Sequence, residues 1–79
     1  MVIYVVRLED FKEYVDNARC VYFRVLPGEI RIYAGRVGVK VPYKDEKEKR
    51  EVLEWLEKLR QTKTVLEIKD VQSEDAFFL

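Results

Sequence analysis

The dipeptide Pro27-Gly28 constrains the fold of this sequence more than any other feature, because it predicts a tight hairpin with a definite register. Proline suits the second position of a type II turn, and glycine suits the third. Folding the chain there pairs Leu26 with Glu29 and continues residue by residue to Val21 opposite Ala34. A slip of one residue would exchange the two faces of the hairpin. The chemistry of both faces therefore tests the register.

The two faces of this predicted hairpin differ in chemistry. One face is apolar, as expected for the core side of a sheet, and carries Val21, Phe23, Val25, Ile30, Ile32 and Ala34. The other face places Tyr22 opposite Tyr33 and Arg24 opposite Arg31. Like charges directly opposite one another destabilise a sheet. Facing arginines beside facing tyrosines are therefore a departure that needs a reason, and a surface that recognises nucleic acid is one such reason.

The remaining elements follow from the spacing of apolar residues. We predict strands at 2–7, 20–26, 29–34 and 64–71 and helices at 8–18 and 46–60. The first strand is apolar on both faces, which is typical of a central strand. Spacings of three and four mark the helices, and Asp45 can cap the second one, with Glu48 in the capping-box position. In the last strand we expect Leu66 and Ile68 to face inward.

The segment after Ala34 leaves two interpretations open. Ile30 and Ile32 occupy even-numbered positions, whereas the valines from Val37 to Val41 occupy odd-numbered positions, and Gly35 and Gly38 bracket the change. Either a bulge lets one long strand continue to Val41, or a tight turn starts a new strand. We favour the bulge, because no turn dipeptide such as Asn-Gly is present.

With the bulge, the order of elements is βαββαβ. This is the ferredoxin-like arrangement, and we predict an α+β fold with an antiparallel sheet and two helices on one face. With a turn, the order becomes βαβββα followed by a strand, a close variant with an extra hairpin. We expect a single domain over 1–71 and an acidic, then apolar, C-terminal tail over 72–79.

Composition narrows the setting in which this chain works. Charged residues make up 38% of the sequence, and many Lys, Arg and Glu with few Asn and Gln is the hyperthermophile pattern. We therefore expect a thermophilic archaeal or bacterial source, or a virus of such a host. The apolar start is too short for a signal peptide or a membrane span, so a soluble, cytoplasmic protein without membrane contact is expected. Cys20, within an apolar strand, is expected to be a small buried hydrophobe.

The residue inventory argues against catalysis. The chain has no histidine, and its only serine is Ser73 in the tail. Ser–His–Asp and Cys–His chemistry are therefore excluded within one chain. Most acidic residues fall on predicted helix surfaces, and their spacing favours no magnesium site. We expect a non-catalytic protein without a metal or another cofactor.

The strongest functional signal is the basic and aromatic face of the hairpin. Between 19 and 44 there are six basic residues and one acid, although the net charge of the whole chain is zero. Tyrosines that project from a sheet can stack on bases, and arginines can bind phosphates. The predicted site for single-stranded DNA or RNA consists of Tyr22, Arg24, Arg31, Tyr33, Arg36 and Lys40. RRM domains use sheets in this way, but their sequence signature is absent. One alternative is an accessory or assembly protein with a partner on this face. Another is a bare solvated face, on which Tyr22 and Tyr33 stabilise the sheet as a cross-strand pair and the arginines add solubility.

The tail is a second candidate for contact with a partner. Residues 73–79 resemble the acidic, phenylalanine-tipped end of bacterial single-stranded-DNA-binding proteins, although the usual Pro-Phe ending is missing. That resemblance implies docking on a protein partner. Phe77, Phe78 and Leu79 are strongly apolar, and such a patch is unfavourable in water. We expect these three residues to dock on this chain or on a second copy in a homodimer, rather than to form a disordered partner-binding peptide.

Overall fold

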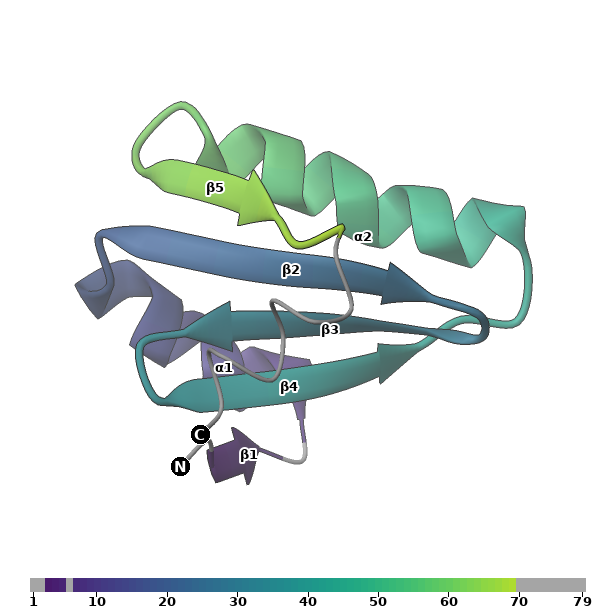
Figure 1. Cartoon of the computed structure of the whole chain (residues 1–79), viewed down its shortest axis with the longest axis horizontal. Coiled ribbons are helices and arrows are strands. Elements are labelled where there is room, and N and C mark those ends of the chain that lie inside the picture. Colours follow the sequence, from purple (N-terminus) through teal and green to yellow (C-terminus); the bar gives the residue numbers. More distant parts are fainter. Residues whose placement is uncertain (1–2, 6, 70–79) are drawn as a thin grey trace.

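The computed structural model describes residues 3–5 and 7–69 of the chain. The helices and strands follow one another in the order β1-α1-β2-β3-β4-α2-β5 (Figure 1). The bounds are Ile3–Val5 for β1, Leu8–Asn17 for α1, Cys20–Leu26 for β2, Glu29–Ala34 for β3, Val37–Pro42 for β4, Glu46–Leu59 for α2 and Thr64–Glu67 for β5. These strands form one sheet in the order β1-β4-β3-β2-β5. The predicted α+β class is confirmed.

The topology differs from the predicted ferredoxin-like sheet. The inner pairs β2–β3 and β3–β4 are antiparallel, but the outer pairs β1–β4 and β2–β5 are parallel, so the sheet is mixed. The βαββαβ order is wrong, and the variant with an extra hairpin is the one that forms. The expectation of a central first strand is also wrong, because β1 lies at an edge of the described sheet. A pattern of apolar residues indicates which faces of a strand are buried, but it does not indicate which other strands pair with it.

The extra hairpin turns at Gly35-Arg36, where we favoured a bulge. Ala34 pairs with Val37, so two residues form the loop. Gly35 has a φ of +63°, and Arg36 does not have a positive φ. A positive φ at the first central position only is the mark of a type II′ turn, whose twist suits a two-residue hairpin. The bulge was therefore the wrong choice, because glycine in front of almost any residue can make this turn.

The hairpin at Pro27-Gly28 has the predicted register. All six pairs from Leu26–Glu29 to Val21–Ala34 form as expected, and Gly28 has the positive φ of +84° that the turn requires. Tyr43, which follows β4, holds this turn in place. Its hydroxyl donates a hydrogen bond to the carbonyl oxygen of Leu26 at 2.6 Å, and its amide donates to the carbonyl oxygen of Gly28 at 3.0 Å.

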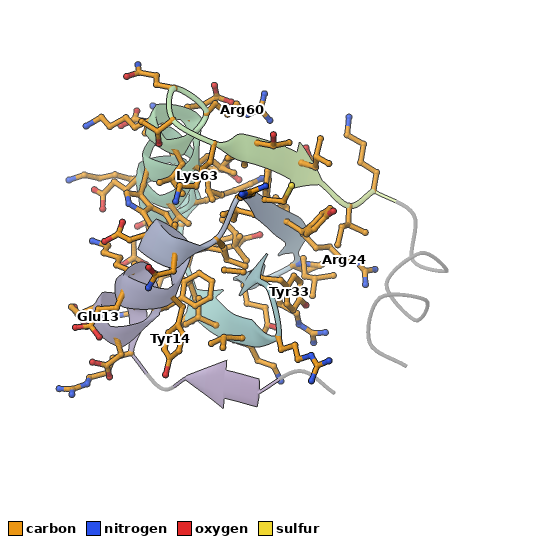
Figure 2. The ribbon with its side chains drawn as sticks, turned by 90° about the vertical axis from the view of Figure 1, so that its left-hand side faces the viewer. Glu13, Tyr14, Arg24, Tyr33, Arg60 and Lys63 are labelled. Carbon is orange, nitrogen blue, oxygen red and sulfur yellow. The ribbon has the colours of Figure 1, made fainter. Side chains whose placement is uncertain are left out.

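Both helices pack on one face of the sheet, and the core lies between the two layers (Figure 2). The buried residues of this core are Phe11, Val15, Val21, Phe23, Ile30, Ile32, Ala34, Val39, Leu56 and Val65. Helix α2 begins as predicted, because the Asp45 side chain accepts a hydrogen bond from the Glu48 amide at 2.9 Å. The Glu48 carboxylate in turn accepts from the Lys44 amide at 2.7 Å. The first bond satisfies a backbone donor that the start of the helix leaves unpaired, and the second fixes the residue that precedes the cap.

Two expectations about burial, for Leu66 on β5 and for Cys20 on β2, are wrong. Val65 faces the core, whereas Leu66 is 48% exposed on the opposite face, so the inward orientation predicted for Leu66 is wrong. The sequence offers adjacent apolar residues here, and only the pairing of Leu66 with Tyr22 decides which face each one takes. Cys20 pairs with Thr64 at the start of the same two strands. It is exposed, not the buried hydrophobe that we expected.

Candidate nucleic-acid interface

The sheet face opposite the helices, here called the far face, carries two rows of side chains that cross the strands. The register aligns Gly38, Tyr33, Tyr22 and Leu66 from β4 to β5, which we call the aromatic row. It also aligns Lys40, Arg31 and Arg24 from β4 to β2, which we call the cationic row. Strands lie about 4.8 Å apart, so the cationic row brings the backbones of three cationic residues within roughly 10 Å.

The position of these rows follows from the alternation of side chains along a strand. Phe23 and Ile32 point into the core, so their neighbours in the chain point the other way. Figure 2 shows Arg24 and Tyr33 on the side of the sheet away from α1 and α2. The structure therefore brings together five of the six predicted basic and aromatic site residues, namely Tyr22, Arg24, Arg31, Tyr33 and Lys40.

The sixth residue, Arg36, lies apart from the rows. It is exposed in the turn between β3 and β4, at the end of the sheet rather than on either row. The predicted partner-binding residues Phe77, Phe78 and Leu79 lie outside the described residues.

An acidic neighbour of Arg31 partly offsets the positive charge of the cationic row. Glu29 lies two residues before Arg31 on the same strand and hence on the same face. The Arg31 Nε lies 2.7 Å from the Glu29 carboxylate oxygen. This hydrogen bond raises the pKa of Arg31 above its ordinary value, although partial burial opposes the shift. Arg31 is therefore a fixed cation. The signal for its ion pair in the sequence is the two-residue period of a strand, which places Glu29 and Arg31 on the same face.

The side chains of the two rows differ in their access to water. Lys40 is exposed, and Tyr22, Arg24 and Arg31 are half-buried. Tyr33 is only 3% exposed, although it lies opposite the helices. All five make further non-covalent interactions. Stacking of a base on the Tyr33 ring therefore requires that this ring first be uncovered.

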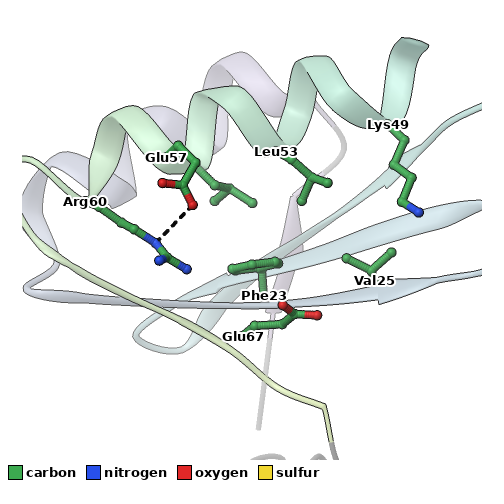
Figure 3. A pocket seen from close by; sticks show the side chains of 8 residues that line it. Phe23, Val25, Lys49, Leu53, Glu57, Arg60 and Glu67 are labelled. Atoms are coloured by element: carbon green, nitrogen blue, oxygen red, sulfur yellow. Dashed lines mark ion pairs between the residues drawn. The ribbon is translucent and has the colours of Figure 1, made fainter. Parts of the chain in front are cut away.

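A hollow of about 360 Å³ lies on the other side of the sheet, between α2 and strands β2 and β5 (Figure 3). Its lining includes the apolar side chains of Phe23, Val25, Leu53 and Leu56 and the charged side chains of Lys49, Glu57, Arg60 and Glu67. The two positive and two negative charges balance, and Arg60 Nε lies 3.5 Å from the Glu57 carboxylate. The hollow therefore offers no excess charge to attract an anion.

Other kinds of site find little support in the described part of the chain. Within residues 3–5 and 7–69, no three His, Cys, Asp or Glu side chains gather where they could hold a metal ion. None of the helices described is long and apolar enough to cross a membrane. Comparison with protein families, with curated proteins and with solved structures finds no match to this chain.

Proposed function

We propose that this protein binds single-stranded nucleic acid through the far face, without catalysis. The observation that carries the proposal is the alignment of the cationic row beside the aromatic row on one sheet surface. Cations of this kind neutralise phosphates, which supplies affinity without regard to sequence. Tyrosine rings next to them can stack on bases, and each stacked base adds about 1–3 kcal/mol.

The proposal is tested by measuring the affinity for a labelled oligonucleotide at several salt concentrations. For single strands, each phosphate contact contributes about 0.7 to the slope of log affinity against log salt. We expect Arg24→Ala and Lys40→Ala each to flatten that slope by about this amount. Tyr22→Ala is expected to weaken binding by about 1–3 kcal/mol with little change of slope.

The matched control is Arg60→Ala on the helix side of the molecule. It removes the same charge as Arg24→Ala, from a side chain that lies away from the far face. We expect this control to bind like the wild type. Equal weakening by Arg24→Ala and Arg60→Ala would show that net charge alone matters, and no binding by the wild type at low salt would refute the proposal.

A protein interface on the same face is the second candidate. It is favoured by the 48% exposure of Leu66 in the aromatic row, since aliphatic side chains are common at the centres of protein interfaces. The molecular mass in solution separates the two candidates. A stable dimer that is insensitive to salt and is disrupted by Leu66→Glu would favour the interface.

A further inference from the structure

Among the residues that the structure describes, two buried apolar residues do not belong to the core between the sheet and the helices. Tyr33 is 3% exposed and Ile68 is 7% exposed, yet neither is part of the cluster between the sheet and the helices. Tyr33 lies on the far face, and both helices lie on the opposite side of the sheet (Figure 2). A tyrosine on an uncovered sheet surface would keep much of its ring in water. The burial of Tyr33 therefore calls for a covering segment.

We propose that residues 70–79 of the same chain dock across the far face and compete there with nucleic acid. The described chain ends at Lys69, directly after Ile68. The Ile68 amide donates a hydrogen bond to the carbonyl oxygen of Phe23 at 2.7 Å, so the chain leaves β5 while still joined to β2. The next ten residues can span up to about 33 Å when extended. Crossing from β5 to β1 requires roughly 19 Å.

The chemistry of this segment complements both rows of the far face. Its acidic residues Asp70, Glu74 and Asp75 can offset the repulsion within the cationic row. Phe77 and Phe78 can cover Tyr33 in the aromatic row.

Docking of the tail would regulate the binding of nucleic acid to the far face. This consequence rests on the proposed function. Carboxylates of the tail and phosphates of a nucleic acid would bind the same cations, so one ligand would exclude the other. The apparent affinity for nucleic acid falls in proportion to the fraction of molecules in which the face is open. Weakening the tail should therefore tighten nucleic-acid binding.

The first test does not involve nucleic acid. Tyrosine residues in the full-length protein are labelled by hydroxyl radicals and quantified by mass spectrometry, with Tyr14 as the internal standard because it is 47% exposed on α1. We expect the double variant Phe77→Ser/Phe78→Ser to increase labelling of Tyr33 several-fold relative to Tyr14. The control variant Gln72→Ala/Ser73→Ala, in the same segment, should leave the ratio unchanged.

The second test uses the milder full-length variant Glu74→Gln/Asp75→Asn, which removes charge without removing apolar surface. We expect it to bind a labelled oligonucleotide several-fold more tightly than the wild type at the same salt concentration. Circular dichroism establishes that each variant is folded.

The outcomes separate the two proposals. Unchanged labelling of Tyr33 in Phe77→Ser/Phe78→Ser would overturn docking of the tail. Increased labelling without oligonucleotide binding by any variant would support docking and overturn the proposed function. Labelling of Tyr33 that falls as the wild-type concentration rises, together with a dimeric mass, would mean that the cover comes from a second copy, which overturns docking within one chain.

Discussion

Lys63 is the residue that ties the connection between α2 and β5 to the end of the first helix. Its ammonium group donates hydrogen bonds to the carbonyl oxygens of Val15 and Ala18, the latter at 3.1 Å. The last carbonyls of a helix lack partners within the helix and lie at the negative end of its dipole. Because α1 has no basic residue in its own last turn, a cation from a distant segment supplies this cap.

We expect Lys63→Met to destabilise the protein by about 1–3 kcal/mol, because it removes a charged donor and keeps the aliphatic stem. Urea unfolding measures the loss as a lower midpoint with an unchanged slope. The matched control is Lys47→Met, since Lys47 is exposed on α2. Equal destabilisation by both variants would contradict a capping role for Lys63.

At the scale of elements, the turn at Gly35-Arg36 decides the number of strands. Glycine could be required at this position either by its backbone conformation or by a lack of space for a side chain. Gly35 has a positive φ, and no neighbouring atom lies within 4 Å of an added Cβ. An added Cβ would meet no obstacle, so only the backbone conformation requires glycine. Because this turn directs β4 back along β3, it places Lys40 beside Arg31 and so completes the cationic row.

We expect Gly35→Ala to destabilise the protein by about 1–2 kcal/mol, the cost of holding a residue with a Cβ at positive φ. Arg36→Ala, in the same turn at an exposed position, should change the free energy of unfolding by less than about 0.5 kcal/mol. Thermal or urea unfolding of the two variants checks the difference. A Gly35→Ala variant as stable as the wild type would rule out the requirement for glycine at this positive φ.

At the scale of the whole molecule, stability should fall from the centre of the sheet toward its edges. Strand β3 is paired on both sides, and its residues Ile30 and Ile32 are fully buried. Strand β1 is three residues long and lies at an edge of the described sheet. Local opening is easiest where few buried contacts hold the backbone.

We therefore expect the amides of Ile30 and Ile32 to exchange with solvent only through global unfolding, whereas those of β1 exchange through local opening. Hydrogen exchange followed by NMR at several denaturant concentrations checks this order. Protection of β1 amides equal to that of β3 would contradict it. The predicted thermophilic origin remains a prediction, which a thermal unfolding curve would probe.

Local patterns in the sequence were sufficient for the two helices, the cap at Asp45 and the full register of the first hairpin. Each depends on neighbours in the chain: apolar spacing of three and four, a side-chain oxygen before a helix, and a Pro-Gly turn that aligns two apolar faces. For the same reason, the pairing of Tyr22 with Tyr33 and of Arg24 with Arg31 was predicted correctly.

Only the tertiary structure decided what depends on pairing between distant segments. The edge position of β1, the parallel outer strands, the outward side of Leu66 and the alignment of Lys40 with Arg31 all follow from which strands lie side by side. Hydrophobic alternation cannot supply this information, because it records whether a side chain is buried and not what lies next to it. The burial of Tyr33 belongs to the same class, since contacts in space determine it and its position along the strand does not.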